Sequence, residues 1–195
     1  MSATTELPLF PLQTVLLPGG PLALRVFEPR YLDMVARCLR GANRFGVVAI
    51  RDGGEVGPAT TYEAGTTAEI VDWQQESGGL LMIVAQGRDA FRLLATRREA
   101  DGLYVGQVEL LEPQPPLPLP DEHAPLAALL RKLVDTLPLY RALPAAFDDA
   151  VWVGSRLVEL LPLALPIKQA LLETRDAGAL LERLAAALRA TEVSP

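Results

Sequence analysis

Residues 6–31 read ELPLFPLQTVLLPGGPLALRVFEPRY, and this stretch decides the fold of the first half of the chain. Leu22, Leu24 and Val26 alternate with shorter or polar residues, as in a strand with one buried face. The sequence Pro-Gly-Gly-Pro that precedes them is typical of a turn. The stretch therefore predicts two short strands, the turn between them and the start of a helix.

The strand pattern continues up to residue 112, because apolar residues mostly recur at every second position. The sequences Ser77-Gly78-Gly79 and Asp101-Gly102 stand between apolar runs and predict hairpin turns with positive φ. About six short strands joined by tight turns favour a small barrel or sandwich. Apart from residues 22–26, the predicted strands cover residues 45–49, 68–72, 80–85, 91–94 and 103–111.

One helix interrupts these strands. Pro29 fits the first turn of a helix without losing a hydrogen bond, and Glu28 stands at the positive end of the helix dipole. Gly41 is expected to end the helix. The residues that recur at helical spacing are Tyr31, Met34, Val35, Cys38 and Leu39.

Residues 113–120, with the sequence PQPPLPLP, predict an extended and stiff connection. Beyond them the apolar residues recur with a period of 3.6, which predicts four helices. The second helix, over residues 147–161, is apolar nearly all round and is expected in the middle of the bundle. We therefore predict one domain over residues 1–113, a linker over 114–120 and a helical domain over 121–195.

Composition is that of a globular protein, since half of the 195 residues are hydrophobic and 22% are charged. The net charge of −6 argues against nonspecific binding to nucleic acid, which depends on an excess of positive charge. The first apolar stretch has no basic residue before it, and no apolar run is long enough to span a membrane. Together with a single cysteine, these features lead us to expect a cytoplasmic protein without a membrane partner.

The order of these elements resembles the N-terminal domain of Lon proteases. Residues 6–31 match its opening, residues 45–48 its next strand, and residues 64–70 its glycine-threonine strand entry. Residues 79–93 match a hairpin that ends in Gly-x-x-Arg-Phe, and residues 160–173 resemble the helical end of the family's domain. The resemblance implies an α+β fold: a small PUA-like β-barrel with one inserted helix, followed by a C-terminal helical bundle.

Catalysis is not expected from this chain. A phosphate-binding loop would need a lysine after a glycine, and neither Lys132 nor Lys168 follows one. Ser155 and Lys168 are a possible peptidase pair, but a helix-packing serine and a surface lysine are the favoured interpretation. The resemblance likewise implies a module that holds protein substrates while separate ATPase and peptidase domains perform the chemistry. We expect no cofactor.

Two residues with reactive side chains, Cys38 and His123, are expected to have structural rather than chemical roles. Cys38 lies on the apolar stripe of its helix, which favours a buried thiol over a nucleophile. His123 follows Asp121 and Glu122, which favours a solvated helix start over a metal site. Zinc is not expected.

Peptide binding has six candidate residues, because the resemblance implies a groove for extended protein segments. Ala90 stands where the family usually has arginine, so any contact that this arginine makes is either absent or supplied by Arg88 or Arg92. The apolar residues 7–17, cut by prolines, are expected as a strand but would suit unfolded peptide if part of them is exposed. The candidates are Phe10, Phe27, Glu28, Arg30, Tyr31 and Arg88.

The Glu28-Pro29-Arg30-Tyr31 sequence has two interpretations. In the first, Arg30 and Tyr31 line the peptide groove. In the second, which the position at a helix start favours, Glu28 and Pro29 begin the helix and Arg30 pairs with a neighbouring carboxylate. At the level of function, we predict a noncatalytic protein- or peptide-binding module, for example an adaptor or regulator of proteolysis, with an RNA-binding PUA-like protein as the alternative.

Overall fold

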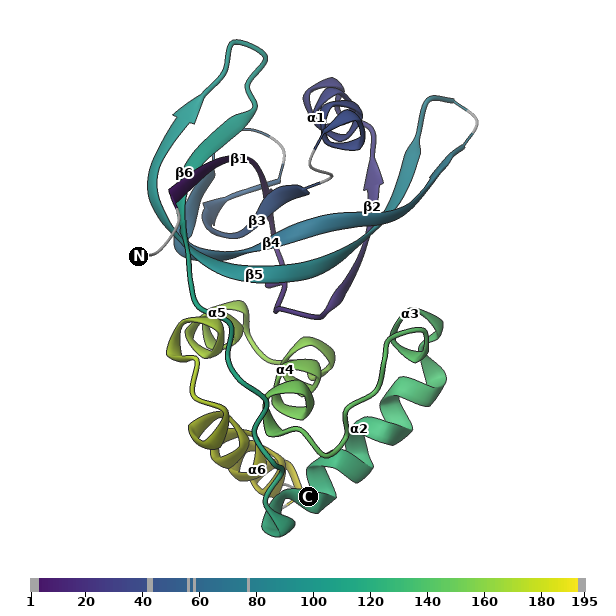
Figure 1. Cartoon of the computed structure of the whole chain (residues 1–195), viewed down its shortest axis with the longest axis vertical. Helices are drawn as coiled ribbons and strands as arrows, with labels where there is room; N and C mark the ends of the chain where they lie inside the picture. Colours follow the sequence, from purple (N-terminus) through teal and green to yellow (C-terminus); the bar gives the residue numbers. More distant parts are fainter. Residues whose placement is uncertain (1–3, 42–43, 56, 58, 77, 193–195) are drawn as a thin grey trace. The chain divides into compact units, whose positions relative to one another are not determined.

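The computed structural model describes residues 4–41, 44–55, 57, 59–76 and 78–192, with side chains up to residue 186. The chain divides into two compact units, Met1–Pro113 and Gln114–Pro195. In its described residues the first unit carries six strands and one helix. The second unit carries helices (Figure 1). The mixed α+β class predicted from the sequence is confirmed.

The strands of the first unit form one sheet in the order β2-β5-β4-β3-β1-β6, and β6 pairs with β5 as well. Strands β5, β4, β3, β1 and β6 therefore form a closed circuit of pairings, with β2 outside it on β5. The β1–β3 pairing is parallel and the others are antiparallel. The strands are β1 (Thr4–Leu12), β2 (Pro21–Val26), β3 (Arg44–Gly53), β4 (Ala59–Gln75), β5 (Leu81–Arg98) and β6 (Tyr104–Leu110).

The prediction of two separate strands over residues 80–85 and 91–94 is wrong, because β5 runs through both without a break. The intervening residues lack the alternating apolar pattern since they make other contacts. Gly87 exchanges backbone hydrogen bonds with Gly19 and Gly20, and Arg88 forms an ion pair with Glu69 on β4. Polar and glycine contacts of this kind leave no periodic signal in the sequence.

The predicted hairpin turns are confirmed at their glycines. Gly78 and Gly79 have φ values of 84° and 83° between β4 and β5, and Gly102 has a φ of 88° between β5 and β6. Such values are unfavourable for residues with a Cβ atom, which explains glycine at these positions. Ser77 of the first predicted turn lies outside the described residues.

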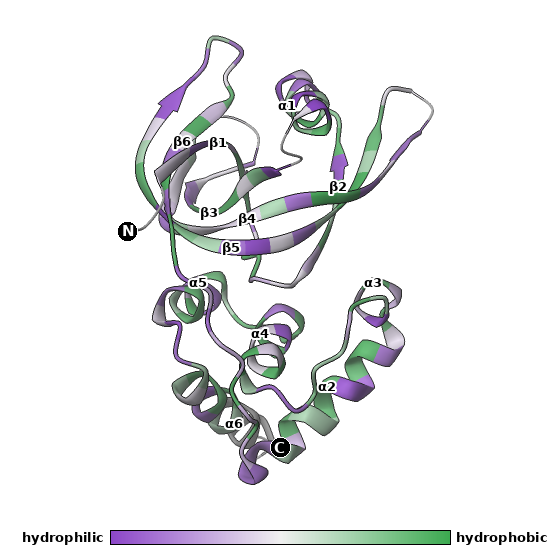
Figure 2. Cartoon of the chain, in the orientation of Figure 1, coloured by the Kyte–Doolittle hydropathy of each residue, from purple (hydrophilic) through white to green (hydrophobic). Residues whose placement is uncertain are grey.

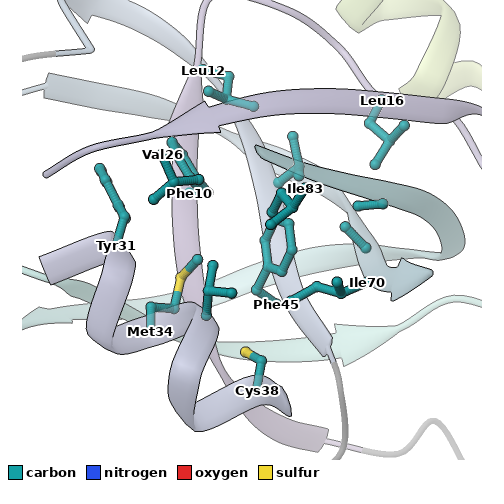
Figure 3. Close-up of a cluster of buried hydrophobic side chains, with 14 of the residues drawn as sticks. Phe10, Leu12, Leu16, Val26, Tyr31, Met34, Cys38, Phe45, Ile70 and Ile83 are labelled. Atoms are coloured by element: carbon teal, nitrogen blue, oxygen red, sulfur yellow. The ribbon is translucent and has the colours of Figure 1, made fainter. Parts of the chain in front are cut away.

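Helix α1 (Pro29–Arg40) confirms the predicted helix, with proline in its first turn and Gly41 after its last residue. Hydrophobic residues lie on the side of α1 that faces the strands (Figure 2). From that side Met34 and Cys38 project towards Phe45 of β3 (Figure 3). Burial of these side chains provides the hydrophobic free energy that fixes α1 on the sheet.

The segment between β1 and β2 is held by β4 and β5. Thr66 Oγ1 of β4 donates a 2.6 Å hydrogen bond to the Leu16 carbonyl, which is buried. Beside it, Gly65 leaves no space for a Cβ atom against the Val47 carbonyl and the Phe91 ring. The glycine-threonine sequence thus allows close strand packing and fixes the chain that leads into β2.

The second unit consists of helices α2 (Ala124–Thr136), α3 (Pro138–Arg141), α4 (Ala150–Leu160), α5 (Leu165–Thr174) and α6 (Ala177–Glu192), with a short 3-10 turn η1 (Asp121–His123). Helix α4 packs against α2, α5 and α6, which confirms its predicted place in the middle of the bundle. The one-turn helix α3 was not predicted, because four residues are too few for a periodic pattern.

Residues 114–120 carry neither helix nor strand apart from a bridge between Pro118 and Asp149, and they are bonded to the second unit. The Leu117 amide donates to Asp149 Oδ1, and the Leu117 carbonyl accepts from the Ala150 amide. The Leu119 amide donates to the Asp148 carbonyl at 2.8 Å. This segment is therefore part of the helical unit and fixes the start of α4.

Candidate functional site

The first unit has a groove of about 280 Å³ beside β2, which we call the β2 groove. Its walls come from the end of β1, from β2 and the two residues after it, and from the start of α1. Residue Glu55, after β3, completes the rim. The lining residues are Phe10, Leu12, Thr14, Leu22, Ala23, Leu24, Arg25, Val26, Phe27, Glu28, Tyr31 and Glu55.

The floor of the β2 groove is aromatic and apolar. The rings of Phe10 and Tyr31 are stacked, with centroids 4.0 Å apart and an interplanar angle of 7°. Val26 and Leu12 lie close to them (Figure 3). Burial raises the pKa of Tyr31 to about 12, so its hydroxyl is neutral at physiological pH. The floor therefore offers apolar contact and one neutral hydroxyl group.

An exposed aromatic residue stands at the end of β2. Phe27 lines the groove, and 63% of its surface is accessible. An exposed ring beside an apolar floor is a common anchor for a protein partner. Phe27 is thus the large hydrophobic residue of the groove whose side chain is exposed.

The rim carries both signs of charge. Arg25 of β2 is exposed, whereas Glu28 and Glu55 lie at the rim with carboxylates engaged in contacts within the protein. Glu55 Oε1 accepts a hydrogen bond from the Gln13 amide at 2.8 Å, and Glu28 Oε2 lies 2.8 Å from Arg30 Nη2. This arrangement does not resemble a phosphate-binding surface, which needs an excess of positive charge.

Arg30 does not line the groove but contacts residues that do. It is 9% exposed and is absent from the groove lining. Its Nη1 donates a 3.0 Å hydrogen bond to the Gly102 carbonyl, in the turn between β5 and β6. Its guanidinium also lies 4.6 Å from the centroid of the Tyr31 ring. Arg30 thus links the start of α1 to that turn, in agreement with the favoured interpretation of an ion-paired arginine at a helix start.

Four of the six predicted site residues come together in the groove: Phe10, Phe27, Glu28 and Tyr31. Arg88 is elsewhere on the sheet, where its Nε donates to Glu69 Oε2 at 2.7 Å. Arg92 pairs with Glu109, and Ala90 is buried. Neither arginine lines the β2 groove.

Sequence reasoning missed Leu22, Leu24, Thr14 and Glu55 as groove residues. The leucines were predicted as one face of a strand, and the alternating pattern carries no information on which strand lies beside it. Glu55 follows a pair of glycines and lies at the groove beside the residue after β1, Gln13, whose amide donates to it. Only the strand pairing brings these residues together.

The other reactive side chains are engaged in the structure. Cys38 is buried as predicted, its Sγ lies 3.1 Å from the Arg44 carbonyl, and burial raises its pKa to about 11. Ser155 is buried in α4, and the Lys168 ammonium donates to the Glu159 carbonyl at 2.9 Å. Partial burial lowers the pKa of Lys168, while Glu159 opposes this change.

Within the described part of the chain, one group of side chains could hold a metal ion: Glu122, His123 and Glu182, with ligand atoms within 4.8 Å of one another. His123 is buried, so the prediction that it belongs to a solvated helix start is wrong for this residue. Its Nε2 lies 3.6 Å from Glu182 Oε1 on α6, far away in the sequence. Both carboxylates are exposed, and Nε2 also lies 3.8 Å from Glu122 Oε1.

Residues 6–190 match the family model of the ATP-dependent protease La (LON) substrate-binding domain. The chain therefore belongs to this family of substrate-binding domains. The match covers nearly all of these 195 residues.

The solved structures that are similar to it include two Lon N-terminal domains. The Lon N-terminal domain protein from Xanthomonas campestris is 40% identical, with a TM-score of 0.77 over 93% of this chain and 98% of that one. The N-terminal domain of the Mycobacterium avium complex Lon protease is 17% identical, with a TM-score of 0.64 over 92% of this chain and 96% of that one. The second similarity shows the fold alone.

Curated relatives are longer proteins. Cereblon from Xenopus tropicalis is 33% identical over 133 residues, which are 66% of this chain and 29% of cereblon. Cereblon from Danio rerio is 35% identical over 64% of this chain and 28% of its own length. Lon protease 2 from Myxococcus xanthus is 29% identical over 87% of this chain and 22% of its own length. The chain thus spans less than a third of each of these relatives.

The described helices include none that is long and apolar enough to cross a membrane.

Proposed function

We propose that this chain is a noncatalytic module that binds extended or unfolded protein segments in the β2 groove. The observation that carries the proposal is an apolar, aromatic groove with an exposed phenylalanine in a member of a substrate-binding domain family. Apolar contact is nondirectional and so tolerates many different sequences. A groove of this kind suits clients that share exposed apolar residues rather than one motif.

Each predicted residue of the groove has a role in this proposal. Phe27 is the exposed anchor, and the stacked Phe10 and Tyr31 rings form the floor beneath a bound apolar side chain. Glu28 holds Arg30, and Arg30 keeps the start of α1 in place. Arg88 has no role, since its guanidinium pairs with Glu69 outside the groove.

The wider proposal concerns fold and context. We propose that the closed circuit of strand pairings is a small PUA-like barrel, and that residues 1–113 and 121–195 are separate domains. The module would act in the cytoplasm as an adaptor or regulator of proteolysis, which the similarity to Lon N-terminal domains supports.

Purified protein should neither hydrolyse ATP nor degrade casein. Turnover that Ser155→Ala abolishes would contradict the noncatalytic assignment.

The test of binding is a titration with reduced, carboxymethylated α-lactalbumin, which is a soluble unfolded protein, and with a single-stranded RNA, each at low and at high salt. We expect micromolar affinity for the unfolded protein, because the client loses conformational entropy on binding. This affinity should change little with salt, whereas phosphate contacts would weaken steeply. Tight, salt-sensitive RNA binding without protein binding would contradict the proposal and favour the RNA-binding alternative.

A further inference from the structure

The β2 groove runs along the edge of a strand. A groove against one face of a strand would be lined by every second residue, because successive side chains point to opposite faces. Seven consecutive residues, Leu22 to Glu28, line this groove. Among the described strands, β2 pairs with β5 alone. The groove therefore gives access to the backbone of β2 on the side away from β5.

The hydrogen bonds at the start of β2 show which backbone groups face the groove. The Gly20 carbonyl accepts a 2.8 Å hydrogen bond from the Gly87 amide and so points towards β5. Backbone groups of successive residues point to alternate sides of an antiparallel strand, and the β2–β5 register runs without a shift. Leu22, Leu24 and Val26 therefore bond to β5, and the N–H and C=O groups of Ala23 and Arg25 face the groove.

Pro21 agrees with this assignment. A proline has no N–H to donate and is accommodated in a strand where that position faces away from the neighbouring strand. By the same alternation, the nitrogen of Pro21 lies on the open side of β2. The open edge thus begins with a residue that needs no partner and continues with two residues that carry both donor and acceptor.

We infer that a client segment binds as an additional strand along the open edge of β2, with backbone hydrogen bonds to Ala23 and Arg25. This inference rests on the proposed function and specifies how the same groove holds its client. An edge strand with free donors and acceptors is a template for an extended chain, and strand addition binds through the main chain with little demand on sequence. The occupant is an extended protein segment rather than a helix, because a helix has no free backbone groups along its sides.

The side chains of the groove define the class of segment. Leu22 and Leu24 pack against the apolar core that includes Val26, whereas Ala23 and Arg25 are exposed on the other face. An added strand continues the same two faces. The best segments therefore have apolar residues at alternate positions and polar residues between them. A proline at a position whose N–H must face β2 would prevent binding.

The inference is tested with a fluorescein-labelled peptide of alternating valine and threonine, with lysine at each end, and with versions that carry one N-methyl group at each amide in turn. Fluorescence anisotropy with the wild-type protein gives the affinities. Every second amide of the bound peptide faces β2. A methyl group on any one of these amides should weaken binding about tenfold, because one hydrogen bond is lost and a steric clash is added. Methylation of the intervening amides should have little effect.

A matched pair of variants tests the protein side. Ala23→Pro removes an N–H that faces the groove, and Ala23→Ser keeps it at the same exposed position. We expect Ala23→Pro to bind the parent peptide about tenfold more weakly and Ala23→Ser to bind it as the wild type does. Circular dichroism and thermal melting verify that both variants are folded. The peptide series needs no variant and stands if Ala23→Pro does not fold.

The outcomes separate this inference from the proposed function. If the parent peptide binds but methylation has no effect, or the same effect at every amide, strand addition is contradicted while binding in the groove stands. If the unfolded α-lactalbumin binds and the parent peptide does not, strand addition is again contradicted. If neither binds, the proposed function fails and the inference fails with it.

Discussion

Strands β2 and β6 are both paired with β5 along the edge opposite β4, yet their own surroundings differ. β6 pairs with β5 over residues 91–98 and with β1 on its other side, so both of its edges are occupied. β2 pairs with β5 over residues 81–86, and its other edge borders the groove. The same long strand thus supports one neighbour that closes the sheet and another that leaves it open.

Because of this difference, a binding site at β2 does not require the strand pairings that stabilise the unit to change. β6 has a neighbouring strand on each side, and its backbone groups need these hydrogen-bond partners. A substitution that removes one of the bonds should therefore destabilise the whole unit. The outer edge of β2 is accessible from the groove, so a client can supply its partners. We therefore expect β6 to be sensitive in stability and β2 to be sensitive in binding.

The largest expected effect comes from proline on each strand. Gln107 of β6 is exposed but lies opposite Glu6 of β1 and Ala95 of β5, so Gln107→Pro removes a bonded amide from a strand with two neighbours. We expect a loss of about 3 kcal/mol or more in unfolding free energy. Ala23→Pro should cost less than about 1 kcal/mol, because Pro fits an edge position. Urea denaturation measures both, and equal costs would contradict the contrast between the strands.

Substitution of Arg30 tests whether this residue links the start of α1 to the turn between β5 and β6. We expect Arg30→Met to cost about 2 kcal/mol, because the Glu28 carboxylate and the Gly102 carbonyl lose a buried charged donor. Arg92→Met is the control, since Arg92 is 62% exposed and its pair with Glu109 should contribute under about 1 kcal/mol. Equal effects of the two substitutions in thermal unfolding would show that Arg30 does not link α1 to the turn.

Substitution of Phe27 tests whether clients bind in the β2 groove. Phe27→Ser should weaken binding of unfolded α-lactalbumin about tenfold, because the side chain is the exposed anchor of the groove. The unfolding free energy should change by less than about 0.5 kcal/mol, as for other exposed sites. Trp73→Ser is the matched control: Trp73 is 53% exposed on β4 and does not line the groove. Equal loss of binding in both variants would show that the groove is not the site.

The smallest effect concerns pH. The pKa of Cys38 is raised from 9.0 to about 11, and that of Tyr31 from 10.0 to about 12, so the folded protein holds these protons more tightly than the unfolded chain. This stabilisation is complete below pH 9 and is lost as pH rises towards 11 and 12. Between about pH 8 and about pH 9.5 we expect a loss of about 1 kcal/mol or less, mostly from Cys38. Cys38→Ala should flatten the profile of unfolding free energy, and an unchanged slope would contradict this.

Much of the fold was predictable because it follows from periodic burial. The alternation at Leu22, Leu24 and Val26, the helical spacing from Tyr31 to Cys38 and the turn glycines all correspond to structure. β5 was not predicted as one strand, because Gly87 and Arg88 make backbone and ionic contacts that have no period. Arg156 was also missed: it lies buried in α4 with its Nε 2.8 Å from Glu159 Oε2, in a helix predicted to be apolar.

The candidate site was partly predictable. The resemblance to a known family pointed to Phe10, Phe27, Glu28 and Tyr31, which the structure brings together. The open edge of β2 could not be predicted, since a strand's sequence determines which face is buried but not which neighbour is missing. The burial of His123 beside Glu182 was unpredictable for the same reason, because it depends on how α6 lies beside η1.

Amide hydrogen exchange of β2, measured by NMR with and without saturating unfolded α-lactalbumin, tests the central claim most directly. The claim is that clients bind along the open edge of β2. It predicts that the amides of Ala23 and Arg25 exchange quickly in the free protein and become protected on binding, while those of Leu22, Leu24 and Val26 are protected in both states. Unchanged exchange at Ala23 and Arg25 in a protein that is saturated with its client would contradict the account.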